Sequence, residues 1–278
     1  MLRTRILTAL VLLLIVAAAV SVASPWPMLA LLAVMCACAW WEWLRLVPCE
    51  SRSASWLAVA AAVVMLAASA GLLQGPAGAY PWMRAVVLPL AVLFWVMGAP
   101  RAVVRAGLPG YWRALPLAVL GAWLLAATWY ALAWVFLTHG VGALISLWAL
   151  VWCADIAAYA VGRTLGRHKL APQVSPGKSR EGAVGGVVAA VLWLAATAVW
   201  WPDSFGALLL NRLGWPGLLL SGVVLAAWSI VGDLFESLLK RRAGVKDSSR
   251  LLPGHGGVYD RIDAVLPVAP AAVLLLLL

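Results

Sequence analysis

Residues 115–137 read LPLAVLGAWLLAATWYALAWVFL, and this stretch contains no charged side chain. A membrane-spanning helix needs about 20 mostly apolar residues in succession, so the stretch predicts such a helix. Residues 141–162, VGALISLWALVWCADIAAYAVG, follow after the short segment THG and contain a single charged residue, Asp155. We therefore expect two successive membrane spans, separated at a glycine.

The rest of the chain has the same character. Of its 278 residues, 65% are apolar and 11% are charged, and the mean hydropathy is +1.00. Soluble chains carry roughly half apolar and a quarter charged residues, so a soluble globular domain is excluded. We expect an all-α, polytopic integral membrane protein with about nine spans. The candidate stretches are 6–23, 26–44, 56–74, 82–99, 115–137, 141–162, 183–201, 215–235 and 264–278.

Basic residues predict the orientation of these spans. If the N-terminus is cytoplasmic, all but two of the 20 Lys and Arg residues fall on the cytoplasmic side, the exceptions being Arg84 and Arg212. The positive-inside rule therefore favours this orientation. The net charge of +10 is then a topology signal, and we expect no nucleic-acid partner. The first stretch also resembles a signal peptide ending at Ser21-Val22-Ala23, which is the less favoured alternative.

The two halves of the chain differ in their ionisable residues. Up to about residue 140 the expected spans hold almost none apart from Glu42 and Arg84, whereas acidic and basic side chains concentrate from Asp155 onward. Ionisable residues within spans are costly and commonly functional. We expect a scaffold region at 1–140 and a catalytic region at 141–278, with cytoplasmic loops at 163–182 and 237–263.

Acidic residues cluster at the predicted cytoplasmic ends of the later spans. Helical spacing places Asp155, Tyr159 and Gly162 on one face. The same spacing aligns Asp233, Glu236, Ser237 and Lys240, while Asp260 and Asp263 precede the last stretch. Carboxylates at one membrane depth repel one another, and a cation among them relieves the repulsion. Because all-oxygen ligands favour hard cations, Mg²⁺ is the expected ion.

Two loops beside these acids are rich in glycine and basic residues. Residues 163–182 offer Lys and Arg side chains, hydroxyls and unhindered N–H groups, and residues 237–263 contain the segment PGHGG. Such groups bind phosphate oxygens, so the combination favours phosphoryl or nucleotidyl transfer. Taken singly, a basic loop is more often a topology determinant, and a lone acid is as often a salt-bridge partner. Gly182 and Gly186 are better explained by close helix packing.

The motifs in this region resemble those of the phosphatidate cytidylyltransferase family. The resemblance runs through residues 237–263, SLLKRRAGVKDSSRLLPGHGGVYDRID, and through the upstream segments DIAAYAVGRTLGRHK (155–169), SPGKSREG (175–182) and GDLFES (232–237). It covers roughly the last 125 residues. Two departures are that Ser249 stands where the family commonly has Gly, and Ala264 where it commonly has Ser.

The resemblance implies a multi-pass enzyme of the bacterial inner membrane, with its active site at the cytoplasmic face. It implies conversion of CTP and phosphatidic acid to CDP-diacylglycerol and pyrophosphate, with Mg²⁺ and a monovalent cation such as K⁺. It also implies a metal role for Asp233 and Asp260, which Asp155, Glu236 and Asp263 would complete. The expected partners are CTP, phosphatidic acid and membrane lipids, and a homodimer is compatible with the sequence.

We expect further residues to bind the phosphates of the two substrates. Lys178, Lys240 and Lys246 are expected at the reaction centre, together with the two aspartates. The expected substrate-binding residues are Ser175, Lys178, Ser179, Ser237, Lys240, Arg241, His255 and Arg261. Two other functions stay open. A CTP-dependent polyprenol or dolichol kinase would release CDP, and a cation-coupled transporter would use the acids as an ion path.

Overall fold

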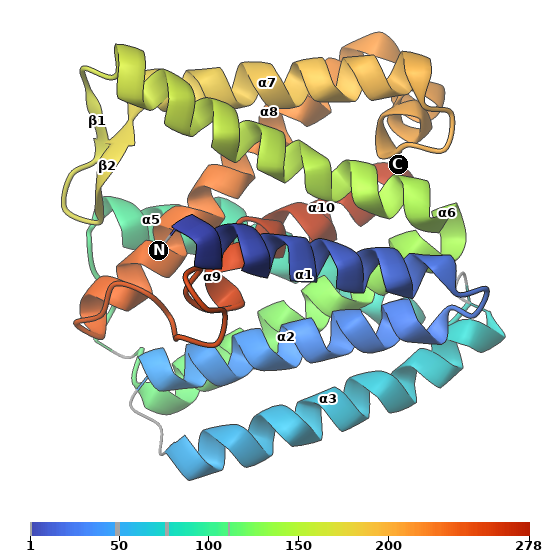
Figure 1. Cartoon of the computed structure of the whole chain (residues 1–278), viewed down its shortest axis with the longest axis horizontal. Helices are drawn as coiled ribbons and strands as arrows, with labels where there is room; N and C mark the ends of the chain where they lie inside the picture. The colour runs from blue at the N-terminus through green and yellow to red at the C-terminus, as the bar shows by residue number, and fades with distance from the viewer. Residues whose placement is uncertain (1, 48–50, 76–77, 111) are drawn as a thin grey trace.

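The computed structural model describes residues 2–47, 51–75, 78–110 and 112–278 (Figure 1). The described chain is almost entirely helical, as the apolar composition predicts. Within the long loop expected at 163–182, however, β1 (Lys169–Ala171) and β2 (Ser175–Ser179) pair as an antiparallel hairpin. The expectation of an all-α chain was therefore wrong at this point, where the sequence has no helical periodicity.

Most helices follow one another with short connections, and the longest described connections are 166–179 and 243–258. Their bounds are α1 Leu2–Ser21, α2 Trp26–Leu46, α3 Ser51–Gln74, α4 Leu88–Leu93, α5 Ala99–Val104, α6 Ala114–Leu165, α7 Arg180–Trp200, α8 Phe205–Arg242, α9 Tyr259–Ile262 and α10 Val265–Leu277, with π-helical turns η1 Met83–Val87 and η2 Phe94–Gly98 before and after α4. Six helical stretches in the described residues are long and apolar enough to cross a membrane. This finding agrees with a membrane protein.

Two of the long helices are broken by glycines. Gly140 in α6 has φ 83° and Gly214 in α8 has φ 66°, both in the left-handed region that glycine tolerates. The non-helical backbone at Gly140 separates two helices within α6, and these correspond to the stretches expected at 115–137 and 141–162. After Gly214, α8 continues to Arg242. The loop expected to begin at residue 237 therefore begins after this helix.

The last apolar stretch is a buried helix. α10 has 13 residues, and all those from Val265 to Val273 are buried. At about 1.5 Å per residue it extends roughly 20 Å, less than the ~30 Å hydrocarbon core of a bilayer. It packs against α4, α6 and α8. Its apolar side chains thus face protein, and the total of nine crossings stays a prediction.

One end of the bundle gathers the segments that carry the charged residues. Figure 1 shows the N-terminus, the β1–β2 hairpin and the loop after α8 at this same end. The end of α1 lies at the opposite end. The hairpin connects α6 to α7, which run side by side. The charged loops therefore share one face of the molecule, as the distribution of basic residues predicts.

Small residues allow α6 and α7 to approach closely. A Cβ atom at Gly186 would lie 2.8 Å from the carbonyl oxygen of Ala154, and one at Gly182 would lie 2.6 Å from that of Ala158. Real Cβ contacts are longer than this. The prediction that these two glycines serve helix packing is confirmed.

We expect Gly186→Leu to lower the free energy of unfolding by about 1–3 kcal/mol, the usual cost of overpacking. The matched control is Gly177→Ala, where an added Cβ meets nothing within 4 Å in the described chain. Thermal unfolding of the detergent-purified variants measures the difference. Equal melting temperatures for Gly186→Leu and the wild type would contradict the close packing of α6 against α7.

Candidate functional site

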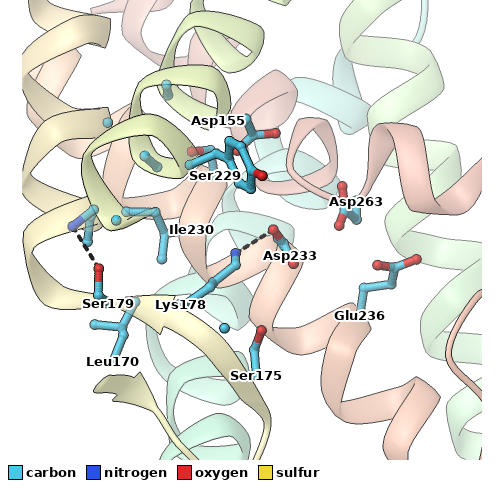
Figure 2. A pocket seen from close by; sticks show the side chains of 18 of the residues that line it. Asp155, Leu170, Ser175, Lys178, Ser179, Ser229, Ile230, Asp233, Glu236 and Asp263 are labelled. Atoms are coloured by element: carbon cyan, nitrogen blue, oxygen red, sulfur yellow. Dashed lines mark hydrogen bonds and ion pairs between the residues drawn. The ribbon is translucent and has the colours of Figure 1, made fainter. Parts of the chain in front are cut away.

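A polar cavity of about 640 Å³ lies where α6, the β1–β2 hairpin, α7 and α8 meet (Figure 2). Asp155, Tyr159 and Gly162 of α6 all line it, which confirms that they share one face. Asp233, Glu236 and Lys240 of α8 line it from another side. Asp260 and Asp263 complete the wall. The cavity therefore collects all five carboxylates that the sequence singled out.

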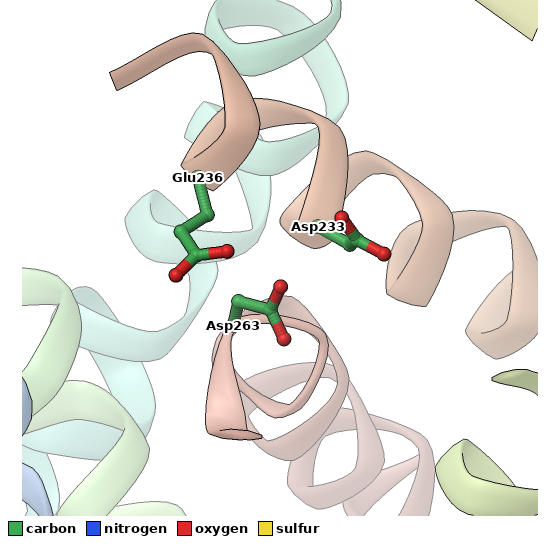
Figure 3. A group of neighbouring side chains, drawn as sticks. All are labelled: Asp233, Glu236 and Asp263. Atoms are coloured by element: carbon green, nitrogen blue, oxygen red, sulfur yellow. The ribbon is translucent and has the colours of Figure 1, made fainter. Parts of the chain in front are cut away.

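Three of these carboxylates form a compact group. Ligand oxygens of Asp233, Glu236 and Asp263 lie within 4.8 Å of one another (Figure 3). Asp233 and Glu236 are one helical turn apart on α8, and Asp263 precedes α10. A side chain at Gly232 would collide with the Asp263 carbonyl oxygen and with Pro267, so this glycine lets the start of α10 reach α8.

The carboxylate group has unused hydrogen-bonding capacity. Glu236 is 1% exposed, and its Oε1 has no hydrogen-bond partner among the described residues. Burial and the neighbouring charge of Asp233 raise the pKa of Asp263 to about 7. Three oxygen donors in so small a space match the ligand chemistry of a hard divalent cation. These residues therefore fit a Mg²⁺ site.

Lys240 connects this group to Asp260. Its Nζ donates to Glu236 Oε2 at 2.6 Å and to Asp260 Oδ1 at 2.7 Å. The second oxygen of Asp260 accepts from the Ser248 N–H at 3.0 Å and the Gly257 N–H at 2.8 Å. Burial raises the pKa of Asp260, but hydrogen bonds that include those from Lys240 and Gly257 outweigh it and bring the pKa to about 2. Asp260 is therefore an anion with both oxygens engaged.

The hairpin contributes cationic and hydroxyl groups to the cavity. Lys178 of β2 forms an ion pair with Asp233 (Figure 2). Ser175 and Ser179 both line the cavity, and the Ser179 hydroxyl also accepts from the Gly182 N–H at 3.1 Å and caps the start of α7. On α8, Ser237 donates to Asp233 at 3.4 Å. The fixed β-strand geometry thus brings Lys178 to the carboxylates.

The cavity contains more acidic than basic side chains. Six carboxylates and four basic groups line it in the described chain. The acids are Asp155, Asp233, Glu236, Asp247, Asp260 and Asp263, and the basic groups are Arg163, Lys178, Lys240 and Arg261. A polyphosphate would meet net repulsion here unless cations accompany it. Additional positive charge would therefore favour anion binding in this cavity.

Four predicted site residues lie outside the cavity lining of the described chain: Ser237, Arg241, Lys246 and His255. Arg241 and Lys246 are exposed, whereas Ser237 donates to the cavity residue Asp233. The carbonyl oxygen of His255 accepts a hydrogen bond from the cavity residue Arg261 at 2.8 Å. The roles expected for these four residues stay predictions.

Arg163 and Glu42 are among the contributors that sequence reasoning missed. Arg163 lines the cavity and donates to the Tyr159 hydroxyl at 2.9 Å. It follows Asp155 by eight residues on the same helix, and this spacing could have predicted that the two side chains lie on the same side of the helix. Glu42 is fully buried on α2 and accepts hydrogen bonds from the loop that carries Asp260. A lone acid in an apolar stretch was the signal there.

An apolar hollow adjoins the polar cavity. It has a volume of about 540 Å³ and is lined by α5, the hairpin and α8. Leu170 and Ile230 line both spaces. Other lining residues include Pro100, Val104, Pro172, Val174, Val231 and Leu234. A molecule with a charged head and an apolar tail could therefore contact both spaces at once.

Comparisons with known proteins agree with the motifs. The model of the cytidylyltransferase family matches residues 3–278. The chain is 38% identical to a phosphatidate cytidylyltransferase of Pseudomonas aeruginosa over 85% of this chain and 82% of that protein. It is 46% identical to a phosphatidate cytidylyltransferase of Haemophilus influenzae and 50% identical to one of Brucella suis. These last two alignments span 44% and 47% of the respective relatives.

We expect Lys240→Met to destabilise the protein strongly, because it leaves Glu236 and Asp260 without their shared cation. Removing one partner of a buried ion pair costs about 3–5 kcal/mol. The melting temperature of the purified protein measures this loss, and the adjacent exposed Arg241→Met is the control. Adding Glu236→Gln to Lys240→Met should restore part of the stability. If Lys240→Met and Arg241→Met melt alike, the ion pairs contribute nothing measurable.

Proposed function

Because the chain belongs to the cytidylyltransferase family, we propose that it is a phosphatidate cytidylyltransferase. It would transfer the cytidylyl group of CTP to phosphatidic acid, giving CDP-diacylglycerol and pyrophosphate. The reaction serves phospholipid biosynthesis. The observation that carries the proposal is the polar, acid-rich cavity at the charged end of an apolar bundle, adjoining an apolar hollow with which it shares Leu170 and Ile230.

The two spaces correspond to the two parts of a lipid phosphate. The phosphate of phosphatidic acid would lie in the polar cavity near Lys178 and Arg261, and an acyl chain would extend past Leu170 and Ile230 into the apolar hollow. Burial of acyl methylene groups supplies affinity at about 0.8 kcal/mol each. CTP would enter the polar cavity from the aqueous side.

We propose that Mg²⁺ is held by Asp233, Glu236 and Asp263. When bound, the ion neutralises phosphate charge and polarises the bond to the leaving pyrophosphate. Asp260 joins these ligands only if Lys240 shifts, since both of its oxygens are engaged. The excess of carboxylates over basic groups also supports a second, monovalent ion such as K⁺, with Asp155 near it.

The side chains of the cavity would orient the two substrates for an in-line reaction. A phosphate oxygen of phosphatidic acid attacks the α-phosphorus of CTP, and the bond from that phosphorus to the β-phosphate oxygen breaks. Lys178, Arg163 and Arg261 hold phosphate oxygens by charge-assisted hydrogen bonds, and Ser175 adds a hydroxyl donor. No protein nucleophile is required, because the lipid phosphate is itself anionic. Positioning and charge neutralisation then supply most of the rate.

We further propose that the enzyme lies in the bacterial inner membrane, with its N-terminus and active site at the cytoplasmic face. The gathering of basic segments at one end of the bundle supports this orientation. A homodimer is also compatible with the exposed apolar faces of the long helices, and the oligomeric state is open to direct measurement.

The test of the function is an assay of the purified protein with phosphatidic acid, Mg²⁺ and CTP labelled at the α-phosphorus. We expect label in the lipid and one pyrophosphate for each labelled lipid formed. Release of CDP would instead indicate a lipid kinase. An absence of turnover with any lipid acceptor, together with ion flux in sealed vesicles, would favour a transporter.

We expect Asp233→Asn to abolish this turnover while leaving the protein folded, because it removes a carboxylate from the proposed metal site. The matched control is Asp203→Asn, which neutralises an exposed carboxylate in the turn between α7 and α8. Size-exclusion profiles and melting temperatures verify folding of both variants. Turnover by Asp233→Asn at the wild-type rate would remove Asp233 from the metal site.

A further inference from the structure

Glu42 is a buried carboxylate outside the cavity, and both of its oxygens accept hydrogen bonds. It lies on α2 with no exposed surface. Its Oε1 accepts from Ser249 Oγ at 2.6 Å and from the Val258 N–H at 2.9 Å. Its Oε2 accepts from Ser248 Oγ at 3.0 Å and from the Tyr259 N–H at 2.6 Å. One side chain therefore holds both ends of the segment from 248 to 259.

The geometry requires a carboxylate at this position. Each oxygen of Glu42 receives one backbone N–H and one serine hydroxyl. A glutamine would have to place its NH₂ group against either the Val258 or the Tyr259 N–H, whichever way the amide is turned. A buried donor facing another donor costs about 1–3 kcal/mol. Ser249 takes part in this pattern, since its hydroxyl donates to Glu42.

The same segment determines where Asp260 lies. The Ser248 hydroxyl is 2.9 Å from Asp260 Oδ2 as well as 3.0 Å from Glu42 Oε2, and Gly257 N–H donates to Asp260. A side chain at Gly257 would collide with Ser248 and with both oxygens of Glu42. Glu42 is thus connected to Asp260 in two ways. The Ser248 hydroxyl lies between the two carboxylates, and the backbone of Val258 and Tyr259, which donates to Glu42, directly precedes Asp260.

Aromatic packing fixes α2 relative to this segment. The Trp43 ring lies 5.4 Å from the ring of Tyr259 and 5.9 Å from that of Phe235 on α8. Its Nε1 donates to the Leu117 carbonyl at 2.8 Å. The rigid position of Trp43 keeps the neighbouring Glu42 aimed at the loop.

We propose that Glu42 is a positioning residue for the reaction. It holds residues 248–259 against α2, so that Asp260 stays beside Lys240 and the carboxylate group of the cavity. This inference rests on the proposed cytidylyl transfer for its kinetic consequence, whereas the anchoring of the loop stands on the contacts alone. Glu42 touches no substrate and acts only through the loop.

The kinetic test compares Glu42→Gln with the wild type and with the control Asp203→Asn. Loss of a residue that orients a catalytic group typically costs about 10- to 100-fold in rate. We expect kcat to fall by that factor in Glu42→Gln, while the KM for CTP changes less than about threefold, because the phosphate-binding side chains stay in place. A kcat equal to that of the wild type would overturn the proposal.

The second readout is independent of activity. Hydrogen exchange of the Val258 and Tyr259 amides, followed by mass spectrometry, should accelerate in Glu42→Gln and stay at the wild-type rate in Asp203→Asn. Unchanged exchange would refute the anchoring. A wild-type protein that fails to transfer the cytidylyl group would refute the proposed function, yet the exchange comparison would still decide the anchoring.

Ser249→Ala provides a milder variant if Glu42→Gln does not fold. It removes one of the four hydrogen bonds, so kcat should fall by a smaller factor with the same constancy of KM. In the Glu42→Gln background the same substitution should have little further effect, since interacting residues are not additive. Full additivity of the two changes would contradict a pathway through Ser249.

Discussion

The arrangement of the site depends on the cost of keeping several carboxylates within an apolar helical bundle. Isolated buried charges are unfavourable by several kcal/mol each unless cations and hydrogen-bond donors surround them. Lys240 meets this requirement for Glu236 and Asp260, and Lys178 meets it for Asp233. The backbone contributes as well, because the N–H groups of Ser248 and Gly257 donate hydrogen bonds to the Asp260 carboxylate. The hairpin and this loop therefore fold over the cavity because the carboxylates need their donors.

Glu42, in the first half of the chain, is another buried carboxylate that needs hydrogen-bond donors around it. The expected division at residue 140 into scaffold and catalytic regions places it in the scaffold, yet its carboxylate accepts four hydrogen bonds from the loop that carries Asp260. Trp43 adds ring contacts with Tyr259 and Phe235. Chain segments more than 200 residues apart thus determine one carboxylate position together. The N-terminal region has few charged residues, yet it contributes to the site because the buried Glu42 faces the segment 248–259.

The sequence predicts those features of the site that helical periodicity controls. The shared faces of Asp155 with Tyr159, and of Asp233 with Glu236 and Lys240, follow from residue spacing alone. The hairpin was missed because short strands in a Gly-rich and Pro-rich segment lack a clear period. The burial of α10 was missed because hydropathy does not distinguish a helix facing lipid from one facing protein. The role of Glu42 could not be predicted, since contacts over such sequence separations depend on tertiary packing.

The charge balance of the cavity would link the binding of the proposed metal to that of the proposed nucleotide. Lys178, one of the basic groups proposed to hold phosphate, is already paired with Asp233. A triphosphate that recruits Lys178 leaves Asp233 without its cation, and that cost falls if a divalent ion is already bound to the carboxylates. Conversely, an ion among Asp233, Glu236 and Asp263 weakens the hold of Asp233 on Lys178 and frees the ammonium for phosphate. By linkage, each ligand then raises the affinity of the other by the same factor, so an acid-rich cavity can bind an anionic nucleotide when the cation accompanies it.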